Sequence, residues 1–163
     1  FEFYYQTTKT AYFSAKNADV RAKIKERLAF QLLQILKQNK DIKILESYYK
    51  DVLSIDVPHI AMLYVETLIS LDKRNRNHWL EEALLHSYAI PDYSKVKELL
   101  SKLVILDSEN RVKWLKELFN LSVGTKDYKK AEEFLIRLTV EDPENRVTWL
   151  KELFNLSIST KNI

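Results

Sequence analysis

A segment of fourteen residues occurs twice in this chain, 35 positions apart, and this repetition is the strongest constraint on the fold. The copies are Glu109–Ser122 and Glu144–Ser157, and they differ at one position, where Lys113 becomes Thr148. A fixed period of roughly 20 to 50 residues is the signature of a repeat architecture. Such repeats stack into solenoids whose extended surfaces usually bind other molecules. The repetition therefore favours a binding protein over an enzyme.

The composition favours long helices joined by short connections. The 163 residues include 1 Gly and 3 Pro, too few for the many turns of a β protein. The chain is 46% hydrophobic and 30% charged, which argues against disorder. It has no Cys, so disulfides, Cys-ligated zinc and a thiol nucleophile are excluded. No apolar run approaches the roughly 20 residues of a membrane span, and no signal peptide is visible.

The charge is modest and lies mainly at the N-terminal end. The net charge is +3, and residues 1–50 carry ten Lys or Arg against five Asp or Glu. A basic excess of this size is usually a solvated helix face rather than a site for a polyanion. The chain begins at Phe1 without Met and stops inside a repeat, so we expect it to be a fragment of a larger protein.

The 35-residue period extends backward through the chain. It relates the three Trp residues, Trp79, Trp114 and Trp149, and three aspartates, Asp72, Asp107 and Asp142. One further step back gives a degenerate repeat over 39–73, in which Ile44-Leu45 replaces the Trp-Leu pair. We predict that the Trp side chains are packing residues between successive repeats.

The spacing of apolar residues within each repeat predicts two helices. Apolar residues over 112–123 cover more than one stripe, so this first helix must bury two sides. Over 128–140, the stripe Tyr128, Ala131, Leu135 and Leu138 defines one buried face.

Turn residues mark where these helices end. Gly124 is predicted to end the first helix, and Asp127 to cap the second at its N-terminus. Pro143 stops the second helix because it cannot continue one. Connections of four or five residues would place the two helices antiparallel.

The first 38 residues predict a helical pair that caps the stack. A helix over 19–37 has an apolar face made of Ile24, Leu28, Leu32, Ile35 and Leu36. Residues 1–16 are aromatic, from Phe1 onward, with a Thr-rich middle. We favour a helix from about Thr7, and residues 1–6 stay open between helix and extended chain.

The repeats resemble a known family. Asp127-Tyr128-Lys-Lys-Ala131, followed by Asp142-Pro143-Glu-Asn145, resembles the second helix and exit turn of a tetratricopeptide repeat, with Tyr, Ala and Pro at the family's positions. The resemblance covers roughly 39–163 and implies a right-handed α-solenoid of about four antiparallel helix hairpins. The first helix departs from the family, since Leu118-Phe119 replaces a Leu-Gly pair and Ser122 a Tyr, which leaves the curvature open.

The alternative family is the pentatricopeptide repeat, which has the same unit length and binds one RNA base per repeat. Its base-reading position would fall near Lys116 and Lys151, where a small polar residue is expected. These lysines and the Asp-Pro-Glu-Asn turn favour the tetratricopeptide family.

By the tetratricopeptide resemblance, the first helices line a concave groove that holds a partner protein or peptide. The lining positions would be His78, Glu82, Lys113, Lys116, Asn120, Lys151 and Asn155. Lys116 and Asn120 point the same way and resemble the start of the family's carboxylate clamp, which binds a peptide C-terminus. Glu152 stands where the next donor is expected, so a plain solvated groove is the simpler interpretation.

No chemistry of an enzyme is visible. His78, Glu82 and His86 share one helix face, but i to i+8 spans ~12 Å, too far to close around one metal. No nucleotide loop, zinc-protease motif or serine-hydrolase motif occurs. We therefore predict no catalytic residue, no cofactor and no metal site.

The sequence thus predicts an all-α solenoid with five segments. They are the capping pair 1–38, the degenerate repeat 39–73, the repeats 74–108 and 109–143, and the half repeat 144–163. The expected function is a protein-interaction scaffold; the alternatives are an RNA-binding helical repeat and a scaffold of a bacterial envelope or secretion machine. Self-association through the half repeat is a further expectation, and the compartment stays open.

Overall fold

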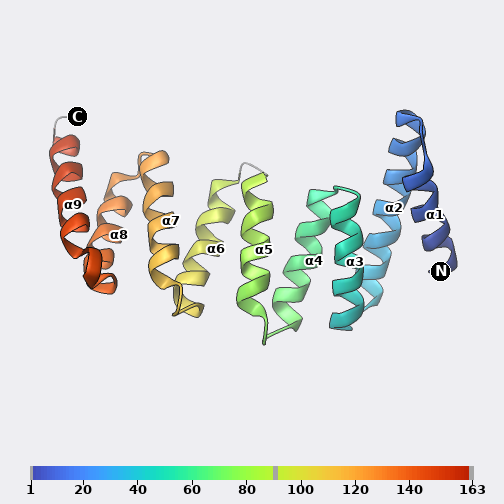
Figure 1. The fold of residues 1–163 in the computed structure, drawn as a ribbon, viewed down its shortest axis with the longest axis horizontal. Coiled ribbons are helices and arrows are strands. Elements are labelled where there is room, and N and C mark those ends of the chain that lie inside the picture. The colour runs from blue at the N-terminus through green and yellow to red at the C-terminus, as the bar shows by residue number, and fades with distance from the viewer. Residues whose placement is uncertain (1, 90–91, 162–163) are drawn as a thin grey trace. The chain divides into compact units, whose positions relative to one another are not determined.

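The chain is all-α, as predicted, and no strand occurs within residues 2–89 and 92–161, which the computed structural model describes (Figure 1). The α-helices are α1 (Glu2–Ser14), α2 (Ala18–Gln38), α3 (Ile42–Ser54), α4 (Pro58–Leu71), α5 (Arg76–Ala89), α6 (Tyr93–Leu106), α7 (Arg111–Gly124), α8 (Tyr128–Glu141) and α9 (Arg146–Lys161). A 3-10 turn, η1 (Pro143–Asn145), precedes α9. Phe1 of the aromatic segment, residues 90–91 of the repeat 74–108 and residues 162–163 of the half repeat lie outside the described residues.

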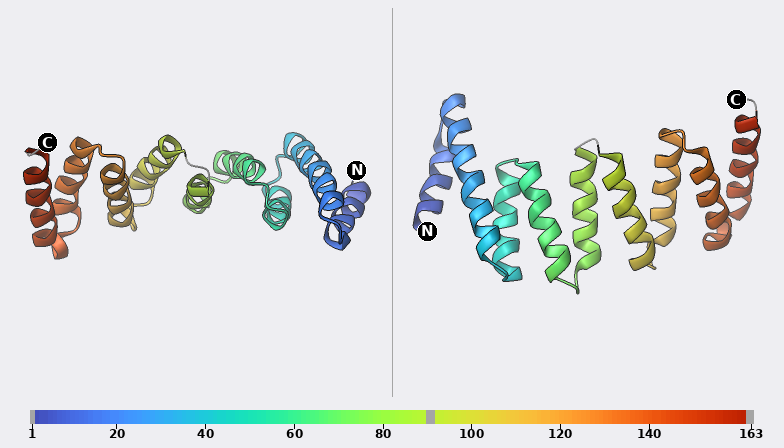
Figure 2. Two further views of the ribbon diagram at one scale, coloured as in Figure 1. Left: turned by 90° about the horizontal axis from the view of Figure 1, so that it is seen from above. Right: turned by 180° about the vertical axis from the view of Figure 1, so that it is seen from behind.

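The structure comprises two compact units, Phe1–His86 and Ser87–Ile163, whose boundary falls within α5. In the first unit α1 packs on α2, α2 packs on α3 and α4, and α3 packs on α4. In the second unit α6 packs on α7, α7 on α8, and α8 on α9. Within each unit the helices therefore pack on their neighbours in the chain (Figure 1 and Figure 2), which is consistent with an α-solenoid.

The N-terminal helix starts earlier than predicted. We expected a helix from about Thr7, but α1 begins at Glu2. The threonines do not interrupt it, because Thr7 and Thr8 donate their hydroxyls to the carbonyls of Phe3 and Tyr4, four residues back. Tyr5 is buried and donates to Asp51 of α3 at 2.7 Å, so tertiary contacts hold the first turn.

The turn between α7 and α8 is built as predicted, with one difference. Asp127 caps α8, since its side chain accepts from the Lys130 amide at 3.3 Å. Helix α7 ends at Gly124, but the residue in the left-handed region is Lys126, with φ of 59°. Asp56, two periods earlier, has φ of 53°. The turn therefore does not use the freedom of Gly124.

Gly124→Ala is therefore expected to stabilise the second unit by about 0.4–1 kcal/mol, because alanine has less conformational freedom in the unfolded chain. A Cβ at this position meets no atom within 4 Å. Urea denaturation followed by circular dichroism measures the change. Lys126→Ala, which keeps the unfavourable φ, serves as control and should not stabilise. A loss of stability in Gly124→Ala would mean that this turn needs glycine after all.

Candidate interaction surface

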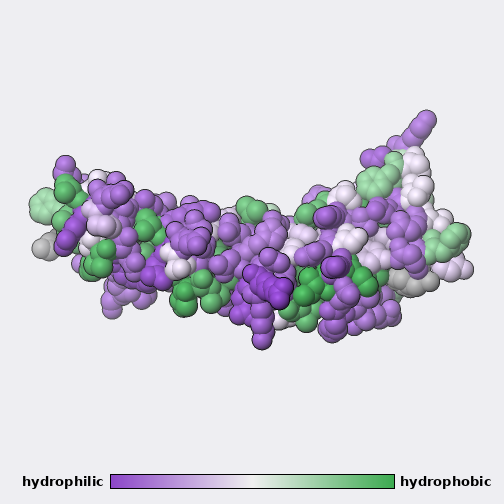
Figure 3. All heavy atoms as spheres, turned by 60° about the horizontal axis from the view of Figure 1, so that its bottom comes forward, coloured by the Kyte–Doolittle hydropathy of each residue, from purple (hydrophilic) through white to green (hydrophobic). Residues whose placement is uncertain are grey.

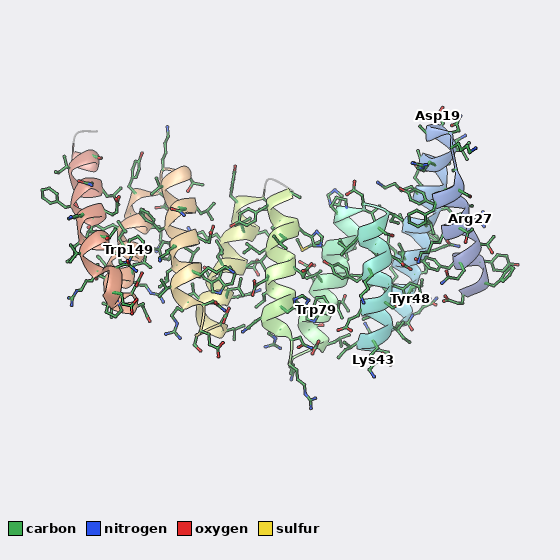
Figure 4. All side chains as sticks on the ribbon, viewed as in Figure 1. Asp19, Arg27, Lys43, Tyr48, Trp79 and Trp149 are labelled. Atoms are coloured by element: carbon green, nitrogen blue, oxygen red, sulfur yellow. The ribbon has the colours of Figure 1, made fainter. Side chains whose placement is uncertain are left out.

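Two of the predicted groove residues, His78 and Glu82, lie beside a groove in the first unit. Its lining residues are Glu46, Tyr49, Lys50 and Leu53 of α3, Asn75, and His78, Trp79 and Glu82 of α5. The groove holds about 340 Å³ and opens to solvent. We call it the α3–α5 groove; Figure 4 labels Trp79 at its α5 side.

A hydrogen-bonded cluster fixes the inner wall of the α3–α5 groove. Tyr49 is buried, and its hydroxyl donates to the Glu82 carboxylate at 2.7 Å. Nε2 of His86 lies 2.7 Å from the Tyr49 hydroxyl oxygen. Because the phenol proton goes to the carboxylate, Nε2 carries a hydrogen and donates to Tyr49. Burial and the neighbouring Glu82 raise the pKa of Tyr49, which therefore stays protonated. The ring of Trp79 packs edge-on against Tyr49, with centroids 5.8 Å apart.

His86 makes the stability of the first unit depend on pH. Burial lowers its pKa below the ordinary 6.5, and Glu82 only partly opposes this. The unfolded chain therefore takes up a proton first as pH falls below about 6.5, and folding stability is lost as pH falls through the folded pKa. We expect stability to decline as pH falls below about 6.5. Urea denaturation at each pH measures this decline, and His86→Gln should flatten it.

A second groove lies on the other flank of α3, within the first unit. Residues of α1, the end of α2 and α3 line about 670 Å³, and we call this the α1–α3 groove. Lys9 pairs with Asp51 at 2.5 Å, and Tyr48 donates to Glu2, so both carboxylates have partners. Lys43 and Tyr48 project from α3 along it (Figure 4). This groove was not predicted from the sequence, because the 35-residue period does not indicate how α1 and the end of α2 lie against α3.

The aligned aspartates and tryptophans form a recurring cluster at the turns that precede α5, α7 and α9. In each cluster the Asp carboxylate accepts from the Trp indole seven residues later and from the Asn side chain three residues later; we call it the Asp-Asn-Trp cluster. Its members are Asp72, Asn75 and Trp79; Asp107, Asn110 and Trp114; and Asp142, Asn145 and Trp149. The Trp–Asp distances are 3.1, 2.9 and 3.0 Å in chain order.

The electrostatics of these clusters follow from their hydrogen bonds. Donation from Asn75 and Trp79 lowers the pKa of Asp72. Burial alone would raise the pKa of Asp142, but donation from Asn145, Trp149 and Lys116 outweighs it, and the pKa is lowered. Asp72, Asp107 and Asp142 are all buried, which explains why a carboxylate at this repeat position needs two fixed donors.

The predicted groove residues of α7 differ in their surroundings. Lys113 lies over its neighbouring Trp114, with Nζ 3.9 Å from the ring centroid. Lys116 pairs with Asp142 at 3.3 Å and lies 5.0 Å from the Trp149 ring, so it joins α7 to the next Asp-Asn-Trp cluster. Asn120 is exposed. Lys116 thus has a structural role that the sequence did not indicate, and the predicted row of donors is not uniform.

The last two predicted residues, Lys151 and Asn155, lie on α9. Both are exposed and line a groove of about 370 Å³ together with Val147, Leu150 and Phe154. This groove is largely apolar in its residues, unlike the two grooves of the first unit. Lys151 occupies the repeat position of Lys116, but its surroundings are open.

The described residues hold no group of three His, Asp or Glu side chains arranged to bind a metal ion. Within the same ranges, every helix is too short or too polar to cross a bilayer.

The chain matches no protein-family model, no curated protein and no solved structure. The tetratricopeptide resemblance therefore rests on the repeat residues themselves.

Proposed function

We propose that the chain is a tetratricopeptide-like protein-interaction scaffold that binds an extended peptide segment of a partner protein along its first helices. The observation that carries this proposal is the pair of grooves that flank α3 in the first unit. The α1–α3 groove uses one flank of α3, and the α3–α5 groove uses the other. A single extended segment can therefore engage both grooves by crossing one helix.

The chemistry of the grooves supports a peptide rather than RNA. The α3–α5 groove presents the carboxylates of Glu46 and Glu82 against one cation, Lys50, beside the exposed apolar Leu53. These carboxylates would repel the phosphates of RNA, whereas a peptide offers both hydrogen-bond donors and cations to them. The α1–α3 groove also mixes both charges, with Lys9 and Lys43 beside Glu2 and Asp51.

Groove substitutions are expected to weaken peptide binding without unfolding the chain. Peptides are selected from a displayed random library, and their affinities are compared by fluorescence anisotropy. Four alanines at Glu46, Lys50, Leu53 and His78 should weaken binding at least about tenfold, the equivalent of ~1.4 kcal/mol. The same change at Lys116, Asn120, Lys151 and Asn155 tests whether the second unit takes part. Each variant should keep its helical circular dichroism spectrum.

The matched control changes Lys129, Lys130, Glu132 and Glu133 of α8 to alanine and should leave binding unchanged. If the α8 set abolishes binding and neither groove set does, the partner binds the second helices and the proposal fails. Single-stranded RNA of mixed sequence should bind no tighter than about 10⁻⁵ M near physiological salt. Tight, sequence-dependent RNA binding would instead favour an RNA-binding repeat.

A further inference from the structure

The two grooves of the first unit differ in whether their carboxylates already have partners. In the α1–α3 groove, Asp51 pairs with Lys9 at 2.5 Å, and Glu2 accepts from the Tyr48 hydroxyl. In the α3–α5 groove, the side chain of Glu46 makes no hydrogen bond or ion pair with any residue that the structure describes. The α3–α5 groove therefore keeps a carboxylate open to a ligand.

Glu82, the second carboxylate of the α3–α5 groove, is held in place and can still accept from a ligand. Its Oε2 accepts from the Tyr49 hydroxyl at 2.7 Å, and the Tyr49 ring packs edge-on against Trp79. Within the described ranges, no group donates to its other oxygen, Oε1. An ionised carboxylate has about four acceptor sites, so Glu82 can take a further donor without releasing Tyr49. Because Tyr49 already orients this carboxylate, less conformational freedom is lost when a ligand binds.

The charges of the α3–α5 groove favour a cation. Glu46 and Glu82 stand against one lysine, Lys50, which is exposed and forms an ion pair with neither of them in the described part of the chain. A cationic donor would gain hydrogen bonds to the carboxylates that are roughly twice as strong as those between neutral groups. A metal ion would need a third ligand beside them, and the described residues hold no such group of three. The cation that fits is therefore a side chain.

The walls of the α3–α5 groove fit the remainder of a basic side chain. Tyr49, Trp79 and the exposed Leu53 line it together with the two carboxylates. Lys and Arg pack their apolar stems along such surface while the charged head keeps polar partners. On the face drawn in Figure 3, hydrophobic and hydrophilic side chains lie interspersed over the first unit. The groove thus offers apolar contact to the stem and carboxylates to the head.

We propose that the α3–α5 groove binds a Lys or Arg side chain of the partner peptide, with Glu82 and Glu46 as its acceptors. The inference rests on the proposed function, since it names the residue that one of the two grooves selects. The site belongs to this groove alone in the repeat pattern, because one period later Tyr49 is replaced by Leu84 and Lys50 by Leu85. A basic residue should therefore be required at one position of the peptide.

The test starts from peptides selected on the intact chain from a displayed random library. We expect the selected peptides to share a Lys or Arg at one position. One of them is then synthesised with that residue and with its neutral analogue, citrulline for Arg or acetyl-lysine for Lys. The neutral analogue should bind at least about tenfold more weakly in fluorescence anisotropy, because it loses the charge-assisted hydrogen bonds.

Variants of the chain locate the site of that preference. Glu46→Gln and Glu82→Gln together should weaken the basic peptide at least about tenfold and leave its neutral analogue unchanged, which isolates the charge interaction. Glutamine at position 82 keeps an oxygen that accepts from Tyr49. Lys50→Gln should strengthen binding of the basic peptide, because it removes a like charge, whereas mere damage to the groove would weaken it. The matched control, Glu132→Gln on α8, should change neither affinity, and circular dichroism should report intact folding of every variant.

The outcomes separate this inference from the proposed function. If the selected peptides need the groove residues but show no basic preference, the inference is wrong and the proposed function stands. If basic peptides bind the Glu46→Gln, Glu82→Gln chain as tightly as the original, the cation binds elsewhere and the inference is again wrong. Free arginine amide that binds as tightly as the peptide, with the same dependence on Glu82, would overturn it in favour of a small-molecule site. If the library yields no peptide at all, both proposals fail.

Discussion

Trp114→Ala is expected to destabilise the second unit by about 3–5 kcal/mol, the usual cost of truncating a buried Trp. The side chain is 3% exposed, so the substitution leaves a cavity that its neighbours fill only in part. It also removes the indole donor from Asp107, a buried carboxylate that would retain Asn110 as its side-chain donor. Loss of a hydrogen bond to a charged group adds to the cost of the cavity. Urea denaturation followed by circular dichroism measures the sum.

Two further variants separate packing from hydrogen bonding. Trp114→Phe keeps an aromatic ring and removes the N–H, so it should cost less than Trp114→Ala. Trp149→Ala removes the same side chain from a position that is only half-buried, and it should also cost less. If Trp114→Ala left the unfolding transition unchanged, the packing assigned to this residue would be wrong.

Leu115→Ala and Leu150→Ala are expected to differ strongly although they make the same change at equivalent positions of the repeat. Leu115 is fully buried, and its truncation should cost about 2–5 kcal/mol. Leu150 is about half exposed, and its truncation should stay within ~0.5 kcal/mol. The two variants share local sequence, helix position and side-chain chemistry. The difference in their free energies of unfolding therefore measures what α8 adds to α7.

Equal losses for the two variants would contradict this account, because they would require a cover over Leu150 in the free chain.

The sequence predicted the bounds of the helices well where the residues that end or cap a helix lie within one turn of it. The helices expected over 19–37, 112–123 and 128–140 extend by one residue at each end of the first two and by one at the end of the third. Pro143 lies outside α8, and Asp127 caps it, because both effects depend on residues within one turn of the chain. The start of α1 was not predictable in this way, because Tyr5 is held by Asp51, 46 residues later.

The side-chain environment of the candidate site was much less predictable. The period aligned Asp72, Asp107 and Asp142, but alignment does not say which donor a carboxylate meets. Lys116 was predicted to line an open groove, because the sequence indicates its helix face but not its ion-pair partner, Asp142. Tyr49 does not recur with the 35-residue period. Its hydrogen bond to Glu82 depends on α5, which only the folded chain brings next to α3.

The Asp-Asn-Trp cluster closes within eight consecutive residues, so every contact that defines it is encoded in one short stretch of sequence. A duplication of 35 residues that includes this stretch copies the whole cluster together with the helix that follows it. No compensating substitution elsewhere is needed for the new cluster to form. Such a chain can be lengthened or shortened by one genetic step, and the near-identity of residues 109–122 and 144–157 is what a recent step of this kind would leave behind.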